Sequence, residues 1–128
     1  MTTDRNFIDY LLELLTPLDG VSAKRMFGGY GLFRDGLMFA LVSDDTLYFK
    51  VDDQSVARFT ERELEPFTYI KAGKPMAMSY YRAPEETMDS SDDMCEWATV
   101  AYEAARRASN RASIRTPKAK RQPKRSSQ

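Results

Sequence analysis

The strongest constraint on the fold is a stretch of short apolar runs between Ser22 and Val51, interrupted by glycines and aspartates. Runs of this length between turn-forming residues are typical of antiparallel strands, and we expect three or four of them here. The run from Leu37 to Val42 (LMFALV) is apolar without alternation, which predicts a central strand covered on both faces. Between Leu47 and Val51 the apolar residues take every second position, so they share one face of a strand.

Helical periodicity precedes and follows this stretch. Between Asp4 and Leu15 apolar residues recur at steps of three and four, and Asp4 is suited to the N-cap position. A last helix is expected from Ser90 to about Arg107, because Ser90 and Asp93 have the spacing of a capping box. The sheet therefore has a helix on each side of it in the sequence.

The middle of the chain completes the element order. Asp52 or Asp53 is expected to cap a short helix that ends near Phe59. Residues 67–70 and 76–81 are expected to form a second hairpin around the sequence AGKP. The predicted fold is a single α+β domain: an antiparallel sheet of about five or six strands flanked by N-terminal and C-terminal helices, with a short central helix.

The net charge of zero conceals an uneven distribution. Residues 1–105 carry ten Lys and Arg against all nineteen Asp and Glu, a net of −9, whereas residues 106–128 carry nine basic and no acidic side chains, a net of +9. After Ser109 the chain has almost no apolar content to offset its ordering entropy. We therefore divide the chain into a folded domain, residues 1–108, and a disordered basic tail, residues 109–128.

Such a tail has three possible uses. It can engage phosphates of a nucleic acid by releasing counterions, fold back onto the acidic body, or act as a plain solubilising extension. The candidate nucleic-acid contacts are the basic side chains at the end of the chain: Arg106, Arg107, Arg111, Arg115, Lys118, Lys120, Arg121, Lys124 and Arg125.

Several kinds of chemistry are excluded by what the sequence lacks. There is no histidine and one cysteine, Cys95, which removes Ser/His/Asp and Cys/His triads and makes a structural zinc site untenable. The stretch FGGYGLFRDG from Phe27 completes neither a GxxxxGK[ST] nor a GxGxxG phosphate loop, and it predicts backbone geometry at a strand bend or bulge. We expect a non-enzymatic protein with no catalytic residue, metal or cofactor.

The remaining polar candidates each have a structural explanation. The acidic doublets 44–45, 52–53 and 92–93 fall at predicted turns and helix starts, where Asp satisfies free backbone amides. Cys95 is expected to be a small buried hydrophobe, and Tyr80 to be a half-buried strand residue rather than a base-stacking one. Lys50 and Lys74 lie beside apolar strands, where they either extend to solvent or anchor an anionic partner.

The chain is expected to be cytoplasmic. Its start, MTTDRNF, has no apolar segment typical of a secretion signal, and no apolar run approaches the roughly 18 residues of a membrane span. A single cysteine fits a reducing compartment.

The run KRMFGGYGLFRDGLMFALVSDDTLYFKVDD, from Lys24 to Asp53, resembles the signature of the TfoX N-terminal domain family. The stretch PFTYIKAGKPMAMSYYRAPEE from Pro66 continues the same pattern, followed by a helix with Trp97 and the AARRA of residues 104–108. The recurrent positions of the family pattern correspond to Arg25, Met26, Phe27, Gly28, Gly29, Gly31, Lys50, Lys74, Met78 and Tyr80.

This resemblance implies an α+β domain with an antiparallel sheet flanked by helices. It also implies a regulator of competence or DNA-uptake genes that acts with a cyclic-AMP-responsive transcription activator, and it implies no catalytic residue. The full-length regulators have a second, C-terminal helical domain, where this chain has its basic tail.

Two functions from different classes follow. The first is a regulatory module whose acidic body binds a protein partner while the tail contacts nucleic acid. The second is a small-molecule or peptide-binding domain with a groove between the sheet and the last helix, near Arg25, Lys50 and Lys74. An enzyme using Lys, Tyr, Asp or Glu for proton transfer is a third option, and pairing of an exposed strand edge would give a homodimer. The expected partner or ligand surface comprises Arg25, Phe27, Gly28, Gly29, Tyr30, Lys50, Lys74 and Tyr80.

Overall fold

Six antiparallel strands form one sheet in the order β1-β2-β3-β4-β6-β5. The computed structural model describes residues 4–26 and 29–115. The strands are β1 (Val21–Met26), β2 (Gly29–Arg34), β3 (Leu37–Ser43), β4 (Thr46–Lys50), β5 (Pro66–Lys71) and β6 (Lys74–Arg82). The helices are α1 (Arg5–Leu14), α2 (Val56–Thr60), a 3-10 turn η1 (Glu85–Met88) and α3 (Ser91–Arg115). This arrangement confirms the predicted α+β fold.

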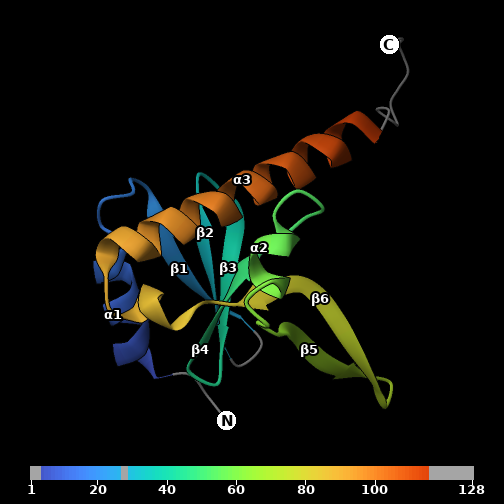
Figure 1. Ribbon diagram of the computed structural model, residues 1–128, viewed down its shortest axis with the longest axis horizontal. Coiled ribbons are helices and arrows are strands. Elements are labelled where there is room, and N and C mark those ends of the chain that lie inside the picture. The colour runs from blue at the N-terminus through green and yellow to red at the C-terminus, as the bar shows by residue number, and fades with distance from the viewer. Residues whose placement is uncertain (1–3, 27–28, 116–128) are drawn as a thin grey trace.

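Helix α3 lies across one face of the sheet, with α1 beside its N-terminal half (Figure 1). The core fills the space between these helices and the strands. Its largest fully buried side chains come from α1, from the central strands and from the two later helices: Ile8, Leu11, Leu15, Leu32, Phe39, Phe49, Phe59 and Met94. In the part of the chain that the structure describes, packed apolar side chains occupy the space between the sheet and the last helix, where we expected a groove.

The β5–β6 hairpin extends away from the helices (Figure 1). Strand β6 pairs with β4 as well as with β5, which places the hairpin at the edge of the sheet beyond β4. Most residues of the hairpin are exposed, since no helix covers its outer half. Ile70 is 70% exposed and Met76 is 42% exposed.

The helix starts follow the expected capping chemistry with one correction. Asp4 caps α1 by accepting a hydrogen bond from the Asn6 amide at 2.9 Å, and the Ser90 hydroxyl accepts one from the Asp93 amide at 3.2 Å before α3. The N-cap residue of α2 is Ser55 rather than an aspartate. Asp52 instead stabilises the preceding turn, because it accepts a hydrogen bond from the Gln54 amide at 3.1 Å.

Helix α3 ends at Arg115, beyond the end predicted near Arg107. The extra residues are largely Ala, Arg and Ser, and alanine and arginine are strong helix formers that continue a helix without needing apolar burial. Residues 109–115 therefore belong to α3 rather than to a disordered segment. Residues 116–128 lie outside the described residues, so a disordered tail there stays a prediction.

No helix among the described residues is long and apolar enough to cross a membrane.

Gly29 and Gly31 provide a matched test of packing within one strand. A Cβ on Gly29 would lie 2.2 Å from the Val42 carbonyl oxygen, a backbone atom, whereas one on Gly31 would meet the flexible Met26 and Met38 sulfurs at 2.7 and 2.8 Å. We expect Gly29→Ala to lower the free energy of unfolding by about 1–3 kcal/mol, because β2 and β3 must separate. Gly31→Ala should cost clearly less. Urea unfolding measures both, and equal losses would contradict this account of the two glycines.

Candidate functional site

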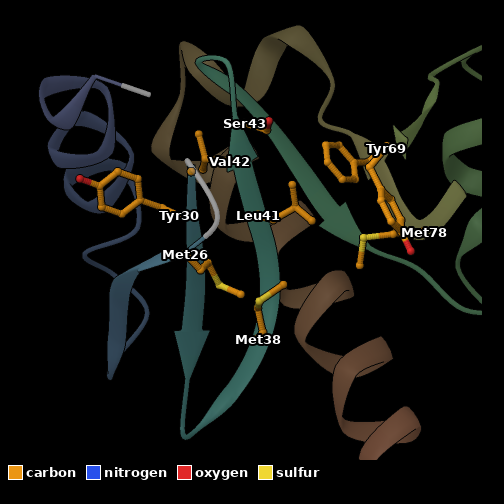
Figure 2. A pocket seen from close by; sticks show the side chains of 10 residues that line it. Met26, Tyr30, Met38, Leu41, Val42, Ser43, Tyr69 and Met78 are labelled. Carbon is orange, nitrogen blue, oxygen red and sulfur yellow. The ribbon is translucent and has the colours of Figure 1, made fainter. Parts of the chain in front are cut away.

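The face of the sheet opposite α3 carries an apolar groove of about 530 Å³. Figure 2 shows Met26 of β1, Met38 and Leu41 of β3, and Tyr69 and Met78 of the β5–β6 hairpin converging on it, whereas Tyr30 points away toward α1. We call it the methionine groove and define it by its large apolar side chains: Met26, Met38, Leu41, Phe67, Tyr69 and Met78. Gly29, Tyr30, Val42 and Ser43 complete the lining.

A β-bulge explains how LMFALV supplies both the core and the groove. Leu32 pairs with Ala40 and Phe33 with Met38, so Phe39 has no partner of its own in β2. The extra residue interrupts the alternation of side chains. Phe39 and Ala40 are both fully buried in the core, and Met38 and Leu41 on either side of them line the groove. One face of this strand is covered by α3 and the other forms the groove, rather than both being covered as predicted.

The floor of the groove depends on Gly31. Its Cα leaves space that the sulfurs of Met26 and Met38 occupy from the neighbouring strands. Any larger residue would require these side chains to move. Gly31 therefore has a packing role on this face, in addition to the backbone role predicted for the glycine-rich stretch.

The β5–β6 hairpin supplies the other wall. Phe67 packs edge-on against Tyr48 with ring centroids 5.0 Å apart, and it stacks on Tyr69 at 6.5 Å. Tyr69 is 39% exposed and Met78 is 37% exposed. This wall is apolar and partly open to solvent.

The predicted surface residues do not gather at one place. Gly29 and Tyr30 line the groove, and Phe27 and Gly28 lie outside the described residues. Arg25 pairs with Tyr30 across β1 and β2 and so shares its face, where Tyr30 joins the core beside α1. Lys74 begins β6 at the tip of the hairpin, far along the sheet from Arg25.

Lys50 and Tyr80 form a small cluster next to the groove. The Lys50 ammonium lies 5.3 Å from the centre of the Tyr80 ring and donates a hydrogen bond to the Ser79 hydroxyl at 2.8 Å. Burial lowers the pKa of Lys50, and the nearby charge of Arg111 lowers it further, against the opposing effect of Asp52. Tyr80 is 6% exposed and donates to the Met38 carbonyl, and its burial raises the pKa to about 12. Tyr80 therefore keeps its proton near neutral pH.

Sequence reasoning missed most of the groove. Met26 and Met78 are positions of the family pattern, but Met38, Leu41, Phe67 and Tyr69 were not predicted to form a site. The available signal was the unusual number of methionines, seven in the chain, several of them in or beside predicted strands. Their convergence depends on the bulge and on the pairing of β4 with β6, which local patterns do not reveal.

The acidic doublets have structural positions. Asp44 and Asp45 form the β3–β4 turn with positive φ values of 51° and 57°, and Asp92 and Asp93 occupy the first turn of α3. In the part of the chain that the structure describes, no three His, Cys, Asp or Glu side chains are placed to hold a metal ion. The Cys95 thiol donates to the Leu14 carbonyl at 3.5 Å, linking α3 to the end of α1.

Asp52 forms the most buried ion pair among the described residues. Arg107 holds its carboxylate through two hydrogen bonds of 2.6 and 3.0 Å, and the Asp52 side chain is 5% exposed. The pKa of Asp52 falls to about 2, chiefly because of the Arg107 hydrogen bond. This pair ties α3 to the turn before α2, so Arg107 is engaged within the domain.

The other basic candidates near the end of the chain differ in their surroundings. Arg106 pairs with Glu103 at 3.2 Å on the surface of α3, and Arg111 is exposed on the same helix. Arg115 is the last residue of α3. The remaining five, Lys118, Lys120, Arg121, Lys124 and Arg125, lie outside the described residues.

Comparison with known proteins identifies the family. The model of the TfoX N-terminal domain matches residues 13–105, a range that contains the whole sheet and most of α3. The chain belongs to the TfoX N-terminal domain family. This confirms the resemblance found in the sequence.

Three relatives in this family show the extent of the similarity. Protein Sxy of Escherichia coli K12 is 34% identical over 73 residues, 57% of this chain and 35% of that protein. DNA transformation protein TfoX of Haemophilus influenzae is 34% identical over 90 residues, 69% of this chain and 42% of that protein. DNA transformation protein TfoX1 of Aliivibrio fischeri is 37% identical over 73 residues, 57% and 35% of the two chains. The chain spans less than half the length of each relative.

The Asp52–Arg107 pair predicts a specific pH dependence. A carboxylate whose pKa falls from 3.8 to about 2 on folding stabilises the fold above pH 4, and this contribution is lost as the pH falls through 2. We expect Asp52→Asn to lower the free energy of unfolding by about 2 kcal/mol at pH 7 and by much less near pH 2. The exposed neighbour offers a control, since Asp53→Asn should change little at either pH. Chemical unfolding across this range measures the difference, and a loss that stayed constant down to pH 2 would be incompatible with the pair.

Proposed function

We propose that this chain is a non-enzymatic regulatory domain that controls genes for DNA uptake by binding a protein partner through the methionine groove. The observation that carries the proposal is the groove itself, an apolar hollow on a sheet face that no helix of the described residues covers. Methionine side chains are flexible and polarisable, and they are common on surfaces that bind other proteins. Two of the relatives are named as DNA transformation proteins, which supports the link to DNA uptake.

The character of the groove favours binding over catalysis. Among the described residues that line it, none has a carboxylate, amine or thiol, and the polar side chains that face it are the hydroxyl of Ser43 and the phenol of Tyr69. Proton transfer in an active site needs a group whose pKa lies near the working pH. Apolar anchoring of a partner needs no such group.

A contact with nucleic acid through the end of the chain is the second part of the proposal. Arg107 is held by Asp52 and Arg106 by Glu103, so these two are poorly placed to bind phosphate. Arg111 is exposed, and the five basic residues from Lys118 to Arg125 carry no acidic neighbours in the sequence. We assign the sequence-independent contact to this segment, and we place the protein's action in the cytoplasm.

Small-molecule or peptide binding is the alternative that the groove also supports. A volume of about 530 Å³ falls within the range of ligand pockets, roughly 300–1,000 Å³. The alternative differs from our first expectation in its location, because Arg25, Lys50 and Lys74 are dispersed along the sheet. Stabilisation of the protein by a metabolite in a thermal-shift panel would favour it over a protein partner.

The regulatory role predicts an effect of the groove on transcription. In cells that lack the chromosomal gene, the wild-type chain should restore transcripts of DNA-uptake genes, and Met78→Glu should not, because it places a charge in the groove wall. Ile70→Glu is the matched control: it changes an exposed apolar residue of the same hairpin that does not line the groove. Quantitative measurement of the transcripts, with circular dichroism of the purified variants, gives the result. Transcripts that do not respond to loss of the gene would rule out the role.

The basic segment predicts a salt-dependent affinity for DNA. Replacing Lys118, Lys120, Arg121, Lys124 and Arg125 with glutamine in the full chain should weaken binding to duplex DNA. Each removed charge should reduce the slope of log K against log salt by about 0.9, if all five contact phosphates. The melting temperature should stay unchanged, since these residues follow the folded domain. Unaltered affinity and slope in a salt titration would remove the segment from the proposed function.

A further inference from the structure

The charges of the domain are segregated between its strands and the rest. The six strands contain seven basic residues and no acidic one. The rest of residues 1–105 contains three basic residues and all nineteen acidic ones, a net of −16. The net charge of −9 in this part of the chain therefore hides a positive sheet on an acidic body.

Most of this positive charge lies on the face that carries the groove. Lys24 is paired with Gly31 at the groove floor, and Lys50 and Arg82 are paired with Tyr80 and Tyr48. Directly paired residues of antiparallel strands point to the same face. By the alternation of β5 and β6, Lys71 and Lys74 share the face of Tyr69 and Met78. We call Lys24, Lys50, Lys71, Lys74 and Arg82 the basic rim.

The basic rim is not neutralised within the domain. Arginines outside the strands are paired with carboxylates, as in Arg5–Asp9, Arg58–Glu96 and Arg62–Glu86. Within residues 4–26 and 29–115, no residue of the basic rim forms an ion pair. Within the described residues, Lys24, Lys71, Lys74 and Arg82 form no ion pair and can attract a partner. Lys50 is partly engaged by the Ser79 hydroxyl, the Tyr80 ring and the charge of Asp52.

We propose that the methionine groove and the basic rim together bind an acidic amphipathic segment of a partner protein. Large apolar side chains of the segment fill the groove, and its Asp and Glu residues face the lysines and Arg82 of the rim. Complementary charges guide the encounter and select the partner, while burial of apolar surface holds it. This inference rests on the proposed function, and it names the chemistry of the partner.

The charge pattern disfavours two other protein occupants. A second copy docked face to face about a two-fold axis would bring the basic rims of the two copies together. The segment after Arg115 carries five basic residues and no acidic one, so the same rim repels it.

The aromatic side chains favour a protein segment over single-stranded nucleic acid. Base stacking requires rings with an open face. Among the described aromatic side chains at the groove, Tyr69 keeps a partly open ring at 39% exposed. Phe67 contacts both Tyr48 and Tyr69, and Tyr80 is 6% exposed under Lys50, so these rings offer little open face to a base. Met26, Met38 and Leu41 lie near one another in the groove lining, and their aliphatic side chains suit aliphatic anchors (Figure 2).

Selection from a library of short random peptides tests the proposal. The target is the full chain with Lys118, Lys120, Arg121, Lys124 and Arg125 replaced by glutamine, so that the end of the chain does not capture acidic peptides. We expect the enriched peptides to combine an excess of Asp and Glu with several large apolar residues. Their affinity should fall as salt is raised, because the rim charges are screened.

Matched variants then locate the binding site by fluorescence anisotropy with an enriched peptide. Met78→Glu and Tyr69→Ser should weaken binding by about tenfold, and Lys24→Gln should weaken it and flatten its salt dependence. Ile70→Glu and Arg25→Gln are the controls, because they alter a neighbouring residue on the opposite face, and they should change the affinity by less than about twofold. Circular dichroism verifies the fold of each variant.

Three results would overturn the proposal. They are the absence of enriched peptides, enrichment without an acidic excess, and binding that is insensitive to both Met78→Glu and Tyr69→Ser. A different result would assign the face to single-stranded nucleic acid instead. Oligothymidylate would then compete with the peptide, and Met78→Glu would weaken the binding of oligothymidylate. Failure of the regulatory role can be distinguished from failure of this proposal. In that case the peptides would bind as expected, but the transcripts of DNA-uptake genes would not respond to loss of the gene.

Discussion

Packing of helix α3 against one face of the sheet is the interaction on which the rest of the structure depends. Its buried side chains are mostly alanines at positions 98, 101, 104 and 105, which let the helix lie close to the strands. Met94 and Trp97 are the large exceptions, and Trp97 packs edge-on against Phe59 of α2 with ring centroids 5.1 Å apart. Two pairings bind the helix at separate points, Cys95 with Leu14 and Arg107 with Asp52. Because this packing covers one face, the described residues leave the opposite face of the sheet open to a partner.

The second face is shaped by departures from regular strand geometry. An ideal β3 would alternate strictly, and it would send Leu41 to the same side as Phe39. The bulge at Phe39 instead puts two successive residues into the core and releases Met38 and Leu41 to the other face. Gly31 then makes room for sulfurs from both neighbouring strands. The pairing of β2 with β3 is thus irregular at one position. This irregularity forms an apolar hollow on one face while Phe39 and Ala40 stay buried in the core on the other.

Much of the fold could be predicted from the sequence because its elements are locally determined. The period of three to four residues in α1, the capping residues Asp4 and Ser90 and the turn aspartates all act within a few positions. The groove could not be predicted, because it needs contacts between distant strands and a bulge that no local pattern marks. The end of α3 was placed too early for a related reason: an apolar stripe predicts where a helix is covered, and helix propensity carries α3 on to Arg115.

The segregation of charge connects the architecture to recognition. Acidic residues cap helices and form turns, because their short carboxylates accept hydrogen bonds from free backbone amides. A domain with many such caps and turns therefore has negative charge around its sheet. Strands need no caps, and here their charged positions are all basic. The net charge of the domain is therefore opposite in sign to the charge of the uncovered sheet face. The field that a partner meets at close range is set by the five basic residues on the groove face, because salt screens the more distant carboxylates within about 10 Å. An acidic domain can in this way attract an acidic partner to one face while repelling it from the others.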